Sequence, residues 1–147
     1  MQWLVLTENQ DKAVAIRSAL PHAVCISTKG LPWVPAVAIG RTISYSKKIK
    51  DKDTELLKKI EEVAVGSDKI LLAFDPSTQG EAAAYEFERF LGAQKCVRWY
   101  APSLHKTEIL KTIQTFESLS DRDLPKSHSG LARNYWCQAL LDITWAH

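Results

Sequence analysis

The sequence predicts an α/β domain in which helices flank a mostly parallel four-stranded sheet, with a C-terminal exit helix after it. Four short apolar runs alternate along the chain with stretches of helical periodicity, a pattern typical of layered α/β folds. One of these runs, residues 69–74, is apolar throughout, as a central parallel strand buried on both faces should be. The composition, 46% hydrophobic and 24% charged, is that of an ordinary soluble globular protein.

The first half of the chain begins with an apolar run at residues 2–6, which we interpret as a buried strand. Residues 11–20 have apolar side chains at helical spacing, and the proline that follows ends this predicted helix. A second strand is predicted at residues 23–27. Residues 29–41 hold two prolines and two glycines, so we expect a loop or a broken strand there. Residues 42–52 form a basic and polar segment.

The second half repeats the alternation more clearly. Residues 53–65 predict an amphipathic helix, and residues 69–74 predict the central strand. A helix over 80–91, opened by a Gly-Glu pair, leads to a fourth strand at 96–100. Residues 107–116 complete the pattern as a third clear helix.

The last part of the chain differs in composition, which suggests a boundary. Residues 1–118 are expected to form the α/β domain. Within residues 119–147, a linker rich in Ser, Asp, Pro, His and Gly precedes a helix that begins near residue 131. Either this helix packs back on the α/β domain, or it belongs to a larger protein; we interpret the segment as the start of a following domain.

Composition also excludes several classes of protein. No apolar run approaches the ~20 residues that cross a bilayer, and no signal peptide is visible, so we expect a cytoplasmic protein with no membrane partner. The formal net charge of +2 is too small to argue for nucleic acid by itself. Cys25, Cys96 and Cys137 lie far apart without metal-ligand spacing, which favours ordinary reduced thiols.

Two acidic residues follow predicted strands, where parallel sheets gather functional groups. Glu8 follows the first strand and Asp75 the central one. Two such carboxylates could hold a hard cation such as Mg²⁺, and Lys12, one helical turn beyond Glu8, could contact a phosphate. The alternative is that both acids are turn and helix-cap residues. Spacing alone leaves this choice open.

A second candidate is the basic stretch that contains Arg41, Lys47 and Lys48. It could face the phosphate backbone of a nucleic acid. The alternative is a solvated loop, because Asp51 and Asp53 dilute the charge.

Residues 75–84, DPSTQGEAAA, resemble the signature of TOPRIM domains in type IA DNA topoisomerases, which reads approximately D-P-D-R-E-G-E-A-I-A. Six positions match: Asp75, Pro76, Gly80, Glu81, Ala82 and Ala84. Residues 4–13 resemble the strand and turn that open the family's domain. Glu8 falls on the glutamate of that motif and Lys12 on its basic residue.

The resemblance continues in order along nearly the whole chain. Residues 37–41 are similar to the family's V-G-H segment, with Arg41 in place of the histidine. Residues 131–144 are similar to the segment that leaves the domain, and Arg133 matches a basic position near bound DNA. The fold implied is a TOPRIM-like, Rossmann-like domain.

The resemblance implies part of an isomerase that binds single-stranded DNA and, with Mg²⁺, cleaves and rejoins a strand. Glu8 would assist proton transfer to the leaving deoxyribose oxygen, Lys12 would contact a phosphate, and Asp75 would be a metal ligand. With the resemblance, the predicted DNA contacts are Arg41, Lys47 and Lys48 of the basic stretch and Arg133, which matches the family's basic position. The family's tyrosine nucleophile lies in a later domain, so we expect this chain alone to be inactive.

The acidic motif departs from the family's D-x-D-x-E pattern. Ser77 and Gln79 replace two of its three carboxylates, and Thr78 replaces the arginine. Ser77 and Gln79 still offer neutral oxygens as ligands, but the loss of two negative charges should weaken Mg²⁺ binding or abolish it. One alternative is therefore a catalytically inactive relative that serves as a DNA-binding or assembly module. Another is a generic flavodoxin-like or receiver-like domain in which Asp75 alone matters.

Overall fold

The computed structural model describes residues 2–100 and 103–146, with side chains given as far as Ile143 at the carboxyl end. The strands in these residues are β1 (Trp3–Thr7), β2 (Val24–Ser27), β3 (Trp33–Ile39), β4 (Ile43–Ile49), β5 (Lys69–Leu72) and β6 (Cys96–Arg98). The α-helices are α1 (Gln10–Ala19), α2 (Thr54–Val65), α3 (Thr78–Leu91), α4 (Lys106–Ser118) and α5 (Ser129–Ala146). Short 3-10 turns, η1 (Asp51–Asp53) and η2 (Asp121–Asp123), precede α2 and follow α4. No helix in the described part of the chain is both long and apolar enough to cross a membrane.

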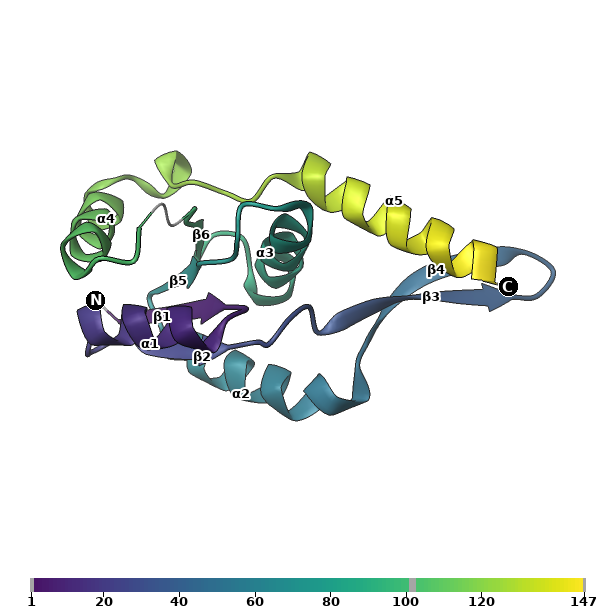
Figure 1. Cartoon of the computed structure of the whole chain (residues 1–147), viewed down its shortest axis with the longest axis horizontal. Helices are drawn as coiled ribbons and strands as arrows, with labels where there is room; N and C mark the ends of the chain where they lie inside the picture. The colour runs from purple at the N-terminus through teal and green to yellow at the C-terminus, as the bar shows by residue number, and fades with distance from the viewer. Residues whose placement is uncertain (1, 101–102, 147) are drawn as a thin grey trace.

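Four of the strands form the predicted parallel sheet, in the order β2-β1-β5-β6 (Figure 1). The chain runs from β1 outward to β2 and then returns to the other side of β1 as β5. The strand order therefore reverses between β1 and β5. In open α/β sheets, ligands bind at the carboxyl ends of the strands at such a switch point.

Helices cover both faces of this sheet, because successive side chains of a strand point to opposite faces. Leu4 and Leu6 of β1 pack with α2, α3 and Trp136 of α5. Trp3 and Val5 point the other way and pack with α1 and α4. The three-layer arrangement is that expected from the apolar runs, and it fixes the carboxyl ends of β1 and β5 against packed helices.

Strands β3 and β4 form an antiparallel hairpin that projects from the sheet (Figure 1). The expectation of a loop or a broken strand over residues 29–41 was wrong for β3, and the basic and polar segment over 42–52, for which no strand was predicted, contains β4. The two strands satisfy each other's backbone hydrogen bonds, and the register places Pro35 opposite Lys47 and Val37 opposite Tyr45. An antiparallel ribbon tolerates this half-exposed, polar sequence because it needs no second buried face.

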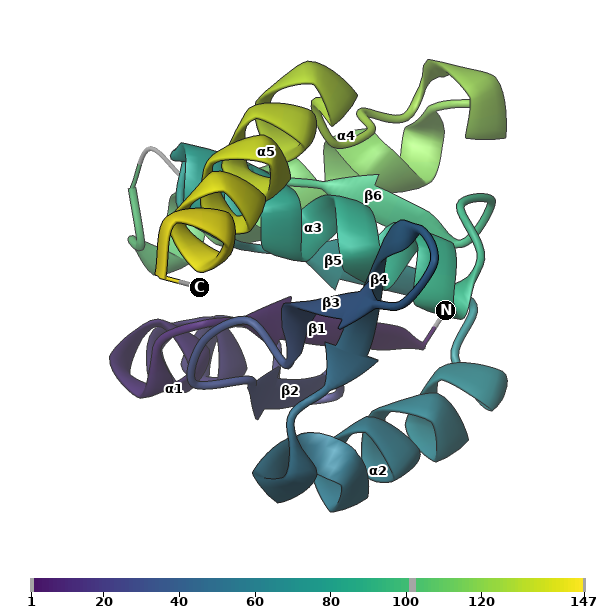
Figure 2. The same cartoon turned by 90° about the vertical axis from the view of Figure 1, so that its right-hand side faces the viewer.

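Helix α5 packs along α3 and lies beside the hairpin in both views (Figures 1 and 2). The segment before α5 is held against the sheet edge and α3. The Arg98 backbone N–H donates to the Pro125 carbonyl oxygen at 2.8 Å. The Ser127 N–H and hydroxyl both donate to the buried carboxylate of Glu88, each at 2.8 Å. Residues 119–128 thus follow the surface of the α/β layers.

Candidate functional site

The acids that follow β1 and β5 lie together at the switch point. The Lys12 ammonium joins them: Nζ donates to Glu8 Oε1 at 3.2 Å and to Asp75 Oδ1 at 2.9 Å. A third donation reaches the Ala73 carbonyl oxygen at 3.2 Å. The convergence expected from the sequence is observed, and we name Glu8, Lys12 and Asp75 the acid–lysine cluster.

Local structure positions the cluster. Asn9 caps α1, and its side-chain oxygen accepts hydrogen bonds from the backbone N–H groups of Asp11 and Lys12. The cap starts the helix directly after the strand, so Lys12 lies one turn beyond Glu8 and reaches the residues that follow β5. The Lys12 side chain is 12% exposed, whereas that of Asp75 is 62% exposed.

The two carboxyl groups have different proton affinities. Burial raises the pKa of the Glu8 carboxyl, although a backbone hydrogen bond and the charge of Lys12 act against this. The hydrogen bond from Lys12 lowers the pKa of Asp75. The Glu8 Oε2 atom is buried and has no hydrogen-bond partner among the described residues. Glu8 is therefore suited to hold and release a proton, while Asp75 stays ionised.

Beside the cluster is a cavity of about 270 Å³. Glu8, Asp75, Ser77 and Gln79 line it, together with the Lys29–Gly30 turn. The Ser77 hydroxyl, however, caps α3, which begins at Thr78 rather than Gly80, and it accepts from the Gly80 N–H at 3.0 Å. The hydroxyl predicted as a neutral metal ligand therefore also accepts a hydrogen bond that holds the start of the helix.

Gly80 is required here because the backbone approaches it closely. A Cβ at position 80 would lie 2.0 Å from the Asp75 carbonyl oxygen. The first turn of α3 therefore packs directly on the residue that carries the second carboxylate.

The oxygen atoms of Glu8, Asp75, Ser77 and Gln79 fit a divalent metal ion less well than the three carboxylates of the family's acidic motif. Among the described residues there is no group of three or more His, Cys, Asp or Glu side chains that could hold a metal ion. Two carboxylates remain, and the Lys12 ammonium lies within hydrogen-bonding distance of both. That ammonium supplies the positive charge that Mg²⁺ would supply to an acidic cluster, so it competes with a cation for the same oxygens.

A buried ion pair lies next to the cluster, and sequence analysis missed it. Arg98 Nε donates to Glu81 Oε1 at 2.5 Å, and both side chains are fully buried. The other Arg98 nitrogens donate to the carbonyl oxygens of Leu72, Phe74, Asp75 and Trp99. The sequence did contain a signal for this pair: Arg98 lies inside an otherwise apolar predicted strand, and a buried charge needs a buried partner.

Glu81 also orders the surroundings of this pair. Its Oε2 accepts from the Tyr100 hydroxyl at 2.7 Å and from the His128 backbone N–H at 2.9 Å. Burial raises the pKa of Glu81, but these hydrogen bonds and that from Arg98 outweigh it and hold the pKa below its ordinary value. Burial and the bond to Glu81 raise the pKa of Tyr100 to about 12. Glu81 is therefore an ionised structural group.

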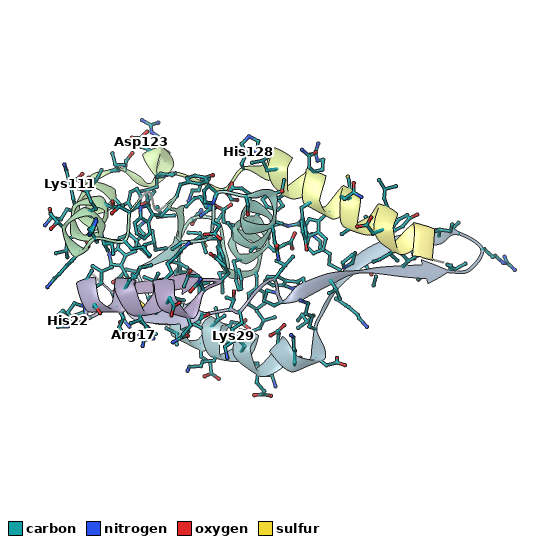
Figure 3. All side chains as sticks on the ribbon, in the orientation of Figure 1. Arg17, His22, Lys29, Lys111, Asp123 and His128 are labelled. Carbon is teal, nitrogen blue, oxygen red and sulfur yellow. The ribbon has the colours of Figure 1, made fainter. Side chains whose placement is uncertain are left out.

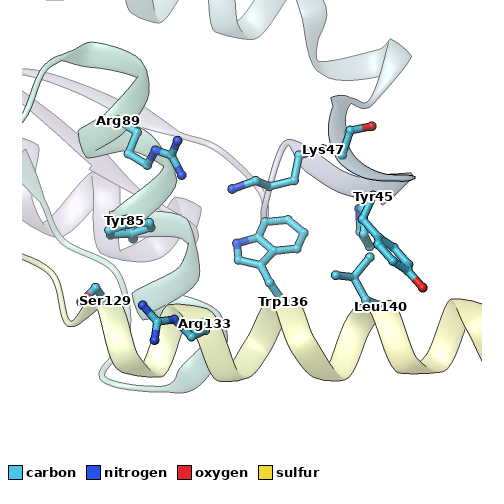
Figure 4. A pocket seen from close by; sticks show the side chains of 10 residues that line it. Tyr45, Lys47, Tyr85, Arg89, Ser129, Arg133, Trp136 and Leu140 are labelled. Atoms are coloured by element: carbon cyan, nitrogen blue, oxygen red, sulfur yellow. The ribbon is translucent and has the colours of Figure 1, made fainter. Parts of the chain in front are cut away.

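The four predicted DNA contacts do not form one cluster. Lys47 and Arg133 line the same cleft between the hairpin, α3 and α5 (Figure 4). Lys48 is on the opposite face of β4 from Lys47, because neighbouring residues of a strand alternate. Arg41 lies in the turn of the hairpin. The histidines are also spread: His22 follows α1 and His128 precedes α5 (Figure 3).

By its fold the chain is a parallel α/β domain with acidic side chains at the switch point of the sheet. The family model described as the Toprim domain matches residues 3–113, from β1 into α4, so the chain belongs to the Toprim domain family. The sequence-based identification is thereby confirmed for the domain.

A solved structure of similar fold is that of full-length topoisomerase I from Thermotoga maritima, in a monoclinic crystal form. It matches with a TM-score of 0.61 at 16% sequence identity, over 84% of this chain. The match covers 21% of that chain, so this chain spans about a fifth of the length of the topoisomerase. No curated protein matches.

Proposed function

We propose that the chain is the Toprim domain of a type IA topoisomerase-like protein and contributes to binding single-stranded DNA and to strand cleavage and religation. The reacting tyrosine would come from outside this chain, so the chain alone is expected to be inactive. The observation that carries the proposal is the acid–lysine cluster at the switch point of a Toprim fold. Other domains of a longer protein are the expected partners, with residues 119–147 leading toward them.

The chemistry assigned to the cluster uses side chains that are present. As the tyrosine oxygen attacks the phosphorus and the bond from phosphorus to the deoxyribose oxygen breaks, the tyrosine gives up its proton to solvent and Glu8 donates one to the leaving oxygen; religation reverses each transfer. Glu8 is suited to this by its raised pKa and by an Oε2 atom that has no hydrogen-bond partner among the described residues. Lys12 orients Glu8 and keeps Asp75 ionised. No step is assigned to Mg²⁺, because only two carboxylates remain and the Lys12 ammonium is bonded to an oxygen of each.

The alternative is an inactive relative that serves as a DNA-binding or assembly module. The observation that favours it is the same donor set, which lacks the charge of the family's acidic motif. The two functions differ in whether Glu8 acts chemically. A fusion or complex with a tyrosine-bearing topoisomerase domain would separate them, because Glu8→Gln abolishes strand cleavage in the first case and changes nothing in the second.

DNA binding is tested with the chain itself. Fluorescence anisotropy of a labelled single-stranded oligonucleotide should show binding at low salt that weakens as salt is raised, because phosphate contacts release counterions. A matched duplex serves as the comparison. Complete absence of binding to the single strand at low salt contradicts both DNA-binding proposals.

The loss of the metal site is tested by restoring it. Ser77→Asp with Gln79→Glu recreates the family's pattern, and aspartate at position 77 still caps a helix well. Calorimetric titration with Mg²⁺ should detect binding to this double variant, whereas the native chain should show little or none to ~10 mM. Tight binding by the native chain would overturn the assignment of Lys12 as the internal counter-charge.

A further inference from the structure

A second cavity lies away from the acid–lysine cluster, between the hairpin, α3 and α5. Its volume is about 270 Å³. Tyr85 and Arg89 enter it from α3, Arg133 and Trp136 from α5, and Lys47 from β4 (Figure 4). We call this cavity the aromatic–basic cleft.

Aromatic faces and cations alternate in the cleft. The Arg89 guanidinium lies 5.7 Å from the centroid of the Tyr85 ring, and Lys47 Nζ lies 5.2 Å from that of Trp136. Tyr85 is half-buried, and Arg89 and Arg133 are exposed. An acidic side chain also meets the cleft's cations, because Lys47 forms an ion pair with Glu86. Arg89 and Arg133 remain as the exposed positive charges, and neither forms an ion pair with a carboxylate within the described residues.

Trp136 adds an independent observation. The side chain is 9% exposed, yet its Nε1 is buried without a hydrogen-bond partner among the described residues. The nitrogen edge of the ring is turned toward the Tyr85 side of the cleft (Figure 4). A buried N–H without an acceptor costs free energy of folding, so a ligand that supplies an acceptor to Trp136 Nε1 would be stabilised here. Displacement of the flexible Lys47 side chain, which is 31% exposed, would open a path to it.

We propose that the aromatic–basic cleft binds one nucleotide of a single DNA strand, with the base against Tyr85 and the phosphate beside Arg133 and Arg89. A base oxygen would accept from Trp136 Nε1. Stacking on aromatic rings combined with a basic groove is how proteins hold single strands without reading their sequence. The inference rests on the proposed function, which it extends to a second contact point on the same strand.

The cleft is tested with a thymidine oligonucleotide that carries 5-iodouracil, irradiated in complex with the full chain. Peptide mapping should place the crosslinks on Tyr85 or Trp136. In anisotropy measurements, Tyr85→Leu should weaken binding roughly 5- to 150-fold, the range seen when a stacking ring is removed, whereas Tyr85→Phe should retain it. Arg133→Gln should lower the slope of log affinity against log salt by about 1.

The matched control is Lys111→Gln, which removes the same charge from the exposed surface of α4 at the opposite end of the molecule (Figure 3). It should leave affinity nearly unchanged. Circular dichroism of each variant checks the fold, and exposed Arg133 offers a test that does not depend on a packed ring. Crosslinks confined to the acid–lysine cavity, with native affinity in Tyr85→Leu and Arg133→Gln, would contradict nucleotide binding in the aromatic–basic cleft but not the proposed function. Absence of any binding would overturn both.

Discussion

Two ionic groups meet at Asp75, and they are built in opposite ways. The Glu81–Arg98 pair is fully buried, and its polar atoms are bonded on all sides, including from Arg98 Nη2 to the Asp75 carbonyl oxygen at 2.9 Å. The acid–lysine cluster instead includes the Asp75 side chain, which is 62% exposed. Within the part of the chain that the structure describes, Glu8 Oε2 has no hydrogen-bond partner. Chemical identity alone does not separate these groups, since each pairs a glutamate with a cation.

The two groups differ in how completely their polar atoms are bonded and in how far they are exposed beside a cavity. A fully satisfied buried pair has no free proton site or open edge, so its effect is on stability. A pair beside a cavity that leaves some of its oxygens without hydrogen bonds keeps a site for a proton and an edge open to a ligand. Mutations should therefore divide accordingly: changes in the buried pair should cost the most stability, and changes in the cluster should cost little.

The largest effect is expected for Glu81→Gln. Breaking a buried pair leaves Arg98 with an uncompensated charge, so the free energy of unfolding should fall by about 3–5 kcal/mol. Urea denaturation measures this loss. Glu55→Gln, in an exposed pair with Lys58, is the control and should change stability by less than about 1 kcal/mol. An equally small loss for both variants contradicts the structural role of Glu81.

Gly80→Ala should cause the second-largest loss of stability. The added methyl group would overlap the Asp75 carbonyl oxygen, so the first turn of α3 or the Asp75 backbone must move. Overpacking of this kind costs about 1–3 kcal/mol. Thermal unfolding gives the loss, and Gly66→Ala is the matched control, since a Cβ there meets no atom closer than 3.8 Å. Similar stability of the two variants would argue against this close approach.

Ser77→Ala should cost about 1 kcal/mol, because α3 loses its side-chain cap. Ser77→Asp should restore it, and urea denaturation compares the two. A neutral Ser77→Ala would contradict the role of the hydroxyl in capping α3.

Lys12→Met is expected to have the smallest effect on stability and a distinctive pH dependence. Lys12 lowers the pKa of Asp75, so its contribution is present above the ordinary value of 3.8 and is lost as pH falls through the lowered pKa of the folded state. The variant should lose up to about 1 kcal/mol near neutral pH and approach the native chain in acid. Urea denaturation across this range measures it. A deficit that does not change with pH indicates lost packing rather than lost charge.

The sheet and its helices could be predicted because long apolar runs allow few other arrangements. The switch-point cluster followed from strand order and the resemblance at Glu8 and Asp75. The hairpin was missed although Ile43, Tyr45 and Ile49 alternate with polar residues, because prolines and lysines masked the period of two. The aromatic–basic cleft could not be predicted from sequence, since it joins Lys47, Tyr85 and Trp136 from three elements whose packing only the structure shows.

Helix α3 fixes the distance between the two regions proposed to contact DNA. Ser77 at its start borders the acid–lysine cavity and Tyr85 borders the cleft, and eight residues of helix span about 12 Å. Because an α-helix barely stretches, the separation of Ser77 and Tyr85 along α3 is fixed. A strand bound at both Tyr85 and the acid–lysine cavity would therefore have to span a separation that the helix keeps constant.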